Sequence, residues 1–77
     1  MSDLFYSRVI SERARQDAIW GGPSHDDRNS LENWIAYICR EASKRTYSPL
    51  DFQKQMIQVA ALAKAAYESI DRDTQKE

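Results

Sequence analysis

Apolar residues recur at helical spacing in three stretches of the chain, and capping or helix-breaking residues separate these stretches. In the first stretch the apolar positions recur every four residues, which is the periodicity of an α-helix with one apolar face. Ser2 or Asp3 can cap this helix, and Gly21 followed by Pro23 predicts that it ends near Ile19. The predicted apolar face consists of Tyr6, Ile10, Ala14 and Ala18, with Phe5 and Val9 beside them.

A second helix is predicted to begin near Asn29 or Ser30, because both residue types are good N-caps. Glu32 follows Asn29 at the spacing of a capping box. Asp26 and Asp27 come just before this helix, where negative charge favours the positive end of the helix dipole. The apolar residues of the helix fall in one stripe at spacings of three and four, namely Leu31, Trp34, Ile35, Ile38 and Ala42.

The third helix has the clearest start signal. Ser48 is a good N-cap, Pro49 suits the first helical position, and Asp51 suits the first turn. We expect this helix to run to about Asp71 and residues 73–77 to form a frayed polar tail. Its apolar residues alternate spacings of four and three, which is the pattern of a coiled-coil seam. The seam consists of Phe52, Met56, Val59, Ala63, Ala66 and Ile70.

Together the three stretches predict a single all-α domain over residues 1–77, with a long C-terminal helix. A chain of this length buries only about 60% of its unfolded surface, so its core is marginal. Such a chain usually needs further stabilisation by disulfides, a metal or a partner subunit. Cys39 is the only cysteine, so no intrachain disulfide can form, and a reduced intracellular protein is indicated. We therefore expect a helical-bundle dimer or higher oligomer, packed largely through the helix over 49–71.

Charge and hydropathy narrow the classes of partner. A formal net charge of −1, from 11 basic and 12 acidic residues, gives no basic excess of the kind that duplex-binding domains concentrate on one face. The longest uninterrupted apolar run, from Val59 to Ala63, is far shorter than the ~20 residues that a membrane span needs. No apolar run of signal-peptide length follows Met1. These features predict a cytoplasmic protein that binds neither a membrane nor duplex nucleic acid.

The connection between the first two predicted helices concentrates the candidate chemistry. His25, the only histidine, precedes Asp26 and Asp27, and Trp20 stands at the end of the first helix. The histidine and the aspartates could ligate a divalent metal, or His25 could carry a proton near neutral pH. The alternative interpretation is a solvated capping loop, since one histidine and two adjacent carboxylates are too few for a closed structural zinc site.

The same connection also suits a nucleotide. Trp20 ends a helix at a glycine hinge and is the better candidate for stacking on a base, because Trp34 falls in an apolar stripe and is expected in the core. Successive backbone amides in a glycine turn can face an anion. Arg40 and Lys44 could hold a phosphate-bearing small molecule. The predicted ligand-binding set is Trp20, Gly21, Gly22, His25, Asp26, Trp34, Arg40 and Lys44.

An Arg-Gln-x-x-x-Trp-Gly segment at 15–21, the His-Asp-Asp segment at 25–27 and a Gln-Val-Ala-Ala-Leu-Ala segment at 58–63 resemble small phage and prophage proteins related to the MazG-like helical family. The resemblance covers roughly residues 12–72. MazG-like enzymes are metal-dependent nucleoside triphosphate pyrophosphohydrolases, whose Mg²⁺ is held by a Glu-Glu-x-x-Glu motif and a Glu-x-x-Asp motif. The matching positions here read Arg40-Glu41-Ala42-Ser43-Lys44 and Gln55-Met56-Ile57-Gln58, which keep one carboxylate. The resemblance therefore implies a related protein with no catalytic residues.

Three functions remain open at this stage. The first is a non-catalytic phage-type protein that sequesters a nucleotide-derived signal in the host cytoplasm, as a counter-defence sponge with no cofactor. Trp20 would then stack on the base, Arg40 and Lys44 would meet phosphates, and His25 with Asp26 would reach sugar hydroxyls. The second is an inhibitor that binds a host protein and no small molecule. The third is a reduced MazG-like hydrolase in which Mg²⁺ is held by His25, Asp26, Asp27 and Glu41.

Overall fold

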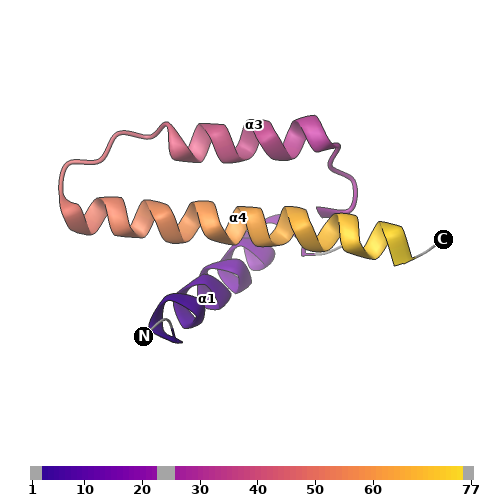
Figure 1. Cartoon of the computed structure of the whole chain (residues 1–77), viewed down its shortest axis with the longest axis horizontal. Helices are drawn as coiled ribbons and strands as arrows, with labels where there is room; N and C mark the ends of the chain where they lie inside the picture. The colour runs from indigo at the N-terminus through magenta and orange to yellow at the C-terminus, as the bar shows by residue number, and fades with distance from the viewer. Residues whose placement is uncertain (1–2, 23–25, 76–77) are drawn as a thin grey trace.

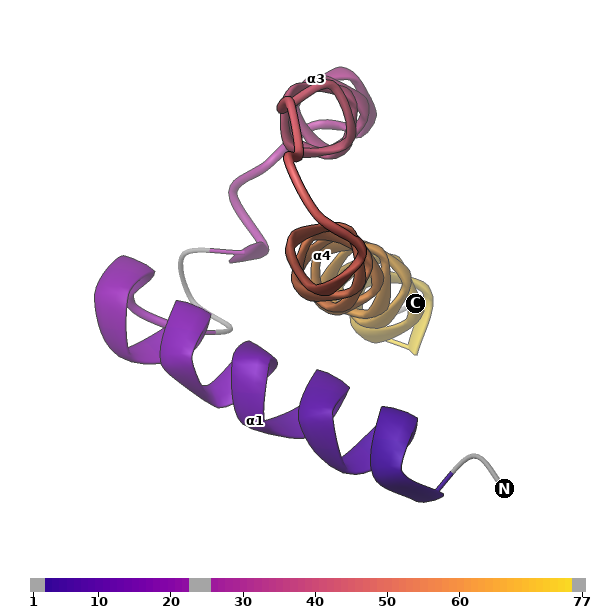
Figure 2. The same cartoon turned by 90° about the vertical axis from the view of Figure 1, so that its left-hand side faces the viewer.

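The computed structural model describes residues 3–22 and 26–75, and over these residues the secondary structure is entirely helical (Figure 1). Helix α1 spans Asp3–Trp20, α3 spans Leu31–Ala42 and α4 spans Pro49–Gln75. Helix α4 packs against both of the others, and Figure 2 shows α3 and α1 on different sides of it. The predicted all-α class and the long C-terminal helix are confirmed. Within the described part of the chain, no helix is long and apolar enough to cross a membrane.

The starts of α3 and α4 follow their capping residues. The Ser30 hydroxyl accepts a hydrogen bond from the Asn33 backbone N–H at 3.1 Å, and Ser48 does the same for Asp51 at 3.1 Å. Both predicted starts are confirmed, with Ser30 rather than Asn29 as the N-cap of α3. Helix α4 continues past its expected end to Gln75, so part of the tail expected to be frayed is helical.

Helix α1 ends where the glycines were expected to end it. Gly21 and Gly22 have φ angles of 99° and 70°, a left-handed conformation that glycine adopts without strain. The Gly21 N–H donates to the Asp17 carbonyl at 2.9 Å, which closes the last turn of the helix. Pro23 and His25 lie outside the described residues.

The face of α1 that is buried differs from the predicted one. The predicted apolar stripe is on the outside, with Tyr6 and Ile10 exposed at 62% and 60%. The buried positions are Val9, Arg13 and Gln16. Apart from Val9, the predicted face was wrong, because apolar spacing alone does not show that the polar side chains of Arg13 and Gln16 are buried. Arg13 can be buried here because carboxylate and amide oxygens satisfy its guanidinium, as described below.

A small core lies between α3 and α4. Trp34 and Leu62 are buried together with Ala65, and Tyr37, Ile38 and Ala66 pack around them. The Trp34 indole N–H donates to the Ser69 hydroxyl at 3.1 Å, so the polar atom of this ring is satisfied inside the core. The prediction that Trp34 belongs to the core is confirmed.

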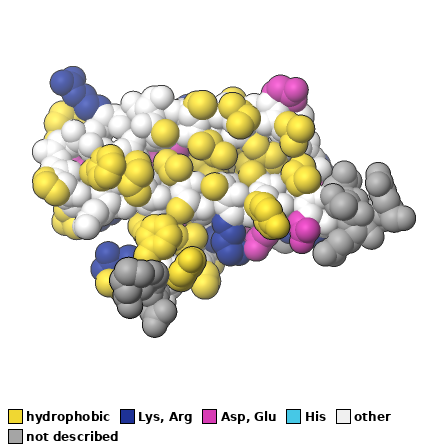
Figure 3. All heavy atoms as spheres, viewed as in Figure 1, with side chains coloured by type: hydrophobic (Ala, Val, Ile, Leu, Met, Phe, Trp, Pro, Cys, Tyr) yellow, Lys and Arg dark blue, Asp and Glu magenta, His cyan; other side chains and the backbone are white. Residues whose placement is uncertain are grey.

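Further apolar residues of α3 and α4, together with Ile38 and Ala66 at the edge of the core, make up one partly exposed surface, here named the hairpin face. Hydrophobic side chains spread over both helices on this side (Figure 3). A groove of about 610 Å³ runs between the two helices at one end of the face. The predicted seam of α4 and the predicted stripe of α3 therefore lie side by side. The hairpin face consists of Leu31, Ile35 and Ile38 with Phe52, Met56, Val59, Ala63, Ala66, Tyr67 and Ile70.

Candidate functional site

A cavity of about 450 Å³ lies between the end of α1, the segment before α3, and the sides of α3 and α4. This volume is typical of small-molecule sites in proteins. Five of the predicted ligand-binding residues line it, namely Trp20, Asp26, Trp34, Arg40 and Lys44. The other lining residues are Asn29, Tyr37, Glu41 and Leu62.

The remaining predicted site residues are placed differently. The N–H of Gly21 is used to close α1, so it does not face an anion as expected. The carbonyl of Gly22 accepts the N–H of Asp26 at 3.0 Å, and neither glycine is among the residues that line the cavity. The glycines therefore shape the turn beside the cavity. His25 lies outside the described residues.

The aromatic residues of the cavity differ in how firmly they are held. Trp34 is only 4% exposed and lies edge-on to Tyr37, with a ring-centroid distance of 6.2 Å. The Tyr37 hydroxyl donates to the side-chain oxygen of Asn29 at 3.5 Å. Trp20 is 44% exposed and closes α1 at the mouth of the cavity. Trp34 and Tyr37 thus provide a fixed wall, whereas Trp20 presents ring surface to an incoming planar group.

Charged residues at the end of α3 and just after it line the opposite part of the cavity. Arg40 and Lys44 are both exposed. The Lys44 ammonium donates to one carboxylate oxygen of Glu41 at 2.9 Å, while the other Glu41 oxygen is buried and has no hydrogen-bond partner among the described residues. An unpaired buried carboxylate oxygen is costly, which favours binding of a group with N–H or O–H donors. The cavity therefore combines cations suited to phosphate with an acceptor suited to a polar edge.

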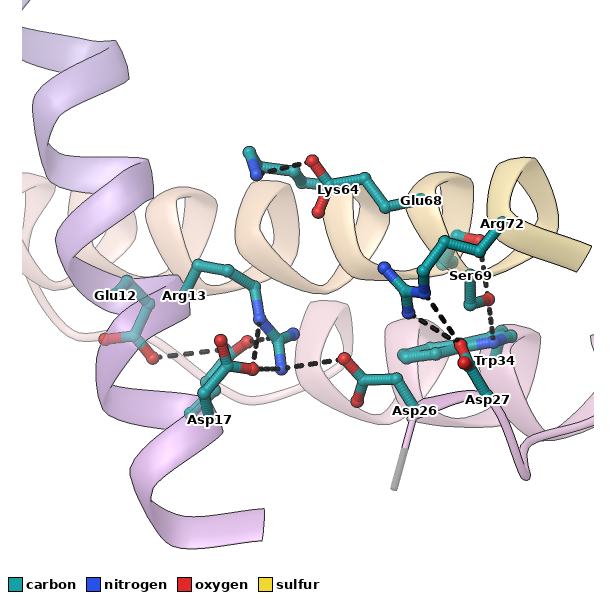
Figure 4. Close-up of polar contacts among 12 residues, drawn as sticks. Glu12, Arg13, Asp17, Asp26, Asp27, Trp34, Lys64, Glu68, Ser69 and Arg72 are labelled. Carbon is teal, nitrogen blue, oxygen red and sulfur yellow. Dashed lines mark hydrogen bonds and ion pairs between the residues drawn. The ribbon is translucent and has the colours of Figure 1, made fainter. Parts of the chain in front are cut away.

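Asp26 and Asp27 are held by arginines from two different helices (Figure 4). Arg13 of α1 donates to buried Asp26 at 3.3 Å. Arg72 of α4 donates to Asp27 at 2.7 and 3.1 Å, and this hydrogen bonding raises the pKa of Arg72. Of the segment interpreted as a solvated capping loop, Asp26 is therefore buried, whereas Asp27 is exposed and His25 lies outside the described residues. The two aspartates join this segment to α1 and to α4.

Besides Asp26, Arg13 contacts two residues of its own helix, α1. Its guanidinium also donates to the Asp17 carboxylate and, at 2.9 Å, to the side-chain oxygen of Gln16. Both Arg13 and Gln16 are buried, at 6% and 2% exposure. The four side chains form a buried polar network that fixes the Asp26 side of the cavity.

Of the residues expected to bind Mg²⁺ in a reduced hydrolase, His25 lies outside the described residues, and Asp26, Asp27 and Glu41 do not form one cluster. Among residues 3–22 and 26–75, no group of three His, Cys, Asp or Glu side chains could hold a metal ion. Asp26 and Glu41 line the same cavity, but Asp27 is bonded to Arg72 instead.

Gln55, which occupies a motif position of the MazG-like resemblance, has a different role in this chain. Its side-chain amide lies within hydrogen-bond distance of the backbone oxygens of Glu41, Ala42 and Lys44, at 2.8, 3.2 and 2.7 Å. These carbonyls belong to the C-terminal end of α3, where helices leave acceptors unpaired. Gln55 therefore caps α3 from α4, and a carboxylate could not donate these bonds.

The predicted ligand-binding set does not contain Tyr37 or Asn29, which line the cavity. A usable signal was present for Tyr37, because Tyr37 and Glu41 are four positions apart and so lie on one side of α3, and Lys44 follows three positions after Glu41. This polar stripe is adjacent to the apolar stripe that contains Trp34. The contact of Arg13 with Asp26 had no comparable local signal.

No protein-family model matches this chain, and comparisons with curated proteins and with solved structures also found no match. The resemblance to MazG-like phage proteins remains a prediction. What the chain does is therefore inferred from the cavity and its lining residues.

Proposed function

We propose that this chain is a non-catalytic binding protein that sequesters a nucleotide-derived small molecule in the cavity between α1, α3 and α4. The observation that carries the proposal is the meeting of Trp20 from α1, Trp34 and Arg40 from α3, and Lys44 from the segment after α3 around one cavity of small-molecule size. An aromatic wall beside two cations matches the two chemical parts of a nucleotide, a planar base and an anionic phosphate.

The exposed ring of Trp20 would stack on the base, because stacking on an aromatic side chain tolerates any base. Arg40 and Lys44 would bind phosphate oxygens through charge-assisted hydrogen bonds. Asp26 and Asn29, on the other side of the cavity, would accept or share hydrogen bonds with sugar hydroxyls. Glu41 would accept from a donor on the ligand after losing part of its contact with Lys44.

Binding without turnover is favoured because the carboxylates of the cavity are paired with basic side chains. Asp26 is bonded to Arg13 and Glu41 to Lys44, so each carboxylate that lines the cavity already has a cationic partner. Catalysis by a MazG-like route depends on several carboxylates that share a metal ion. Together with the resemblance to phage proteins, this supports a sponge that removes a nucleotide signal in the host cytoplasm.

We further propose that the protein acts as a homo-oligomer packed through α4. The support is the hairpin face, on which Ile35 is 62% and Phe52 50% exposed. A second candidate function, inhibition of a partner protein, is favoured by a different observation. The outer stripe of α1 exposes Tyr6 and Ile10, an apolar surface that a partner helix could cover.

Native mass spectrometry and calorimetric titration with linear and cyclic nucleotides test the proposed binding. We expect one unaltered nucleotide per cavity, and we expect Trp20→Ala to weaken binding by about 5-fold to 150-fold, as stacking contributes about 1–3 kcal/mol per base. Tyr6→Ala is the matched control, since Tyr6 is an exposed aromatic residue of the same helix that does not line the cavity.

Three outcomes would overturn this proposal. Undiminished affinity in Trp20→Ala would remove the assigned base-stacking site. A product of altered mass would favour the reduced hydrolase. An absence of binding across the panel would favour the protein-inhibitor function.

A further inference from the structure

We infer that two copies of this chain associate through the hairpin face about a two-fold axis, with their α4 helices antiparallel. The inference rests on the proposed homo-oligomer and specifies its surface, its symmetry and the residues that meet. It does not depend on the identity of the ligand, because the cavity lies on the other side of Trp34 from this face.

The hairpin face has the composition of an interface rather than of a solvated surface. Leu31 and Ile35 are each 62% exposed, and Tyr67 is 74% exposed. The groove between the helices has a single charged lining residue, Asp71, at one end. Large contiguous apolar patches of this kind mark binding surfaces in soluble proteins.

The other sides of α4 are already occupied within one chain. Leu62 and Ser69 face α3 and contact Trp34, and Gln55 caps the end of α3. Helix α1 packs against a further side of α4. The described part of a single chain therefore has no additional helix to cover the hairpin face.

The spacing of the α4 seam is the same in both directions. Its residues, Phe52, Met56, Val59, Ala63, Ala66 and Ile70, are separated by four, three, four, three and four positions, so the series is symmetric about position 61. A two-fold axis at that point superimposes the seam of one copy on the reversed seam of the other. An isologous contact requires this kind of self-complementary surface, and a second copy of the chain supplies it.

The antiparallel arrangement also pairs large side chains with small ones. Val59 of each copy opposes Ala63 of the other and Met56 opposes Ala66, while Phe52 and Ile70, two large side chains, meet at the ends of the seam. A parallel arrangement would place Ala63 opposite Ala63 and Ala66 opposite Ala66, which leaves voids, and would crowd Met56 against Met56. Because interiors pack without voids, the antiparallel pairing is favoured.

Charged residues at the two ends of the α3–α4 pair also favour the antiparallel orientation. Leu31 and Ile70 line one end of the groove, and the acidic residues Glu32 and Asp71 adjoin them there. The other end carries Lys44, Arg45 and Lys54 beside Glu41 and Asp51, so it has a small excess of positive charge. Antiparallel association brings the acidic end of one copy to the basic end of the other, whereas parallel association would bring like charges together.

Cysteine cross-linking tests the antiparallel sense. In a Cys39→Ser background, Val59→Cys and Ala63→Cys chains are mixed, equilibrated and mildly oxidised, and the products are identified by mass. We expect the mixed disulfide between Val59→Cys and Ala63→Cys to dominate, because opposed positions bring the Cβ atoms close enough to bond. Predominance of the Val59→Cys homodisulfide would indicate a parallel arrangement and overturn the inference.

Analytical ultracentrifugation of point variants tests the surface. Ile35→Glu on the hairpin face should convert the dimer to a monomer, while Ile10→Glu, an equally exposed isoleucine on α1, should leave the dimer intact. Far-UV circular dichroism confirms that both variants are folded. Because Ile35 is exposed in the single chain, its replacement does not disturb the core.

The outcomes separate this inference from the proposed homo-oligomer. A wild-type protein that sediments as a monomer at all concentrations overturns both. An oligomer that survives Ile35→Glu but dissociates with Ile10→Glu keeps the homo-oligomer and overturns the assignment of the hairpin face. Loss of the dimer in Ile35→Glu alone, together with the mixed disulfide, supports the inference.

Discussion

At the scale of single residues, buried charge attaches α1 to the rest of the molecule. Arg13 is 6% exposed, and its hydrogen-bond partners Asp17 and Asp26 come from the same helix and from the segment that follows it. A buried arginine is tolerated when carboxylates and other acceptors satisfy it, and removal of one partner leaves an uncompensated charge. The attachment of α1 therefore depends on polar contacts as much as on its single buried apolar residue, Val9.

Glu12 beside this network should make stability depend on pH. The Arg15 guanidinium donates to Glu12 at 2.9 and 2.7 Å and lowers the pKa of Glu12. A carboxyl group with a lowered pKa stabilises the folded state above its unfolded pKa of about 4.3, and this contribution is lost as the pH falls through the folded pKa. We expect Glu12→Gln to lose less stability than the wild type on acidification from neutral pH to below pH 4.

Urea unfolding at both pH values measures this difference. Arg15→Gln is the companion variant, because it removes the hydrogen bond that lowers the pKa of Glu12 while leaving the carboxylate in place. It should likewise reduce the pH dependence. An identical loss of stability on acidification in wild type and Glu12→Gln would contradict the role assigned to the Arg15 contact.

At the scale of elements, the end of α3 depends on a side chain from α4. Replacement of Gln55 by glutamate keeps the size of the side chain but places carboxylate oxygens against the carbonyls of Glu41, Ala42 and Lys44. The loss of these hydrogen bonds, and the repulsion between the new carboxylate and the carbonyl oxygens, should destabilise the fold by about 1–3 kcal/mol. Urea unfolding at neutral pH measures the effect.

Gln58→Glu is the matched control for this prediction, since Gln58 lies about one turn further along α4 and is only half-buried. We expect a much smaller change there. Equal effects at Gln55 and Gln58 would show that added negative charge on α4, rather than loss of the cap, destabilises the protein.

The ends of the helices could be predicted from sequence because they are fixed by neighbouring residues. Ser30 and Ser48 cap helices by bonding to backbone N–H groups three residues later, and Gly21 ends the helix that directly precedes it. The buried face of α1 could not be predicted in this way. Its apolar stripe is outside and Arg13 is inside, because the partner that buries Arg13 lies thirteen residues away.

The candidate site could likewise be predicted only in part. Trp34, Arg40 and Lys44 could be chosen from the sequence as an aromatic residue and a nearby basic cluster, and the structure brings them to one cavity with Trp20. The anchoring of Asp27 by Arg72 could not be predicted, since the two residues are 45 positions apart and meet only after α4 has folded back along α3. Long-range ion pairs leave no periodic pattern in a sequence.

At the scale of the whole molecule, the inferred dimer predicts that thermal stability depends on protein concentration. Association that is specific to the folded state raises the free energy of unfolding by mass action. Each kcal/mol gained shifts the Tm of a domain of this size upward by about 4–8 °C. Circular dichroism melts over about a hundredfold range of concentration measure the shift.

We expect the Tm of the wild type to rise with concentration and that of Ile35→Glu to stay constant. Ile10→Glu, on the outer stripe of α1, should keep the wild-type dependence. A constant Tm in the wild type over this range would contradict the dimer.

The position of Trp34 links the two surfaces of the molecule. Its side chain contributes to the walls of both the cavity and the groove of the hairpin face. A ligand that moves this ring changes the surface offered to a second copy, and a second copy that moves the ring changes the cavity. By thermodynamic reciprocity, the factor by which ligand tightens or loosens association equals the factor by which association alters ligand affinity. If the proposed ligand and the inferred second copy both displace Trp34, ligand affinity will depend on protein concentration.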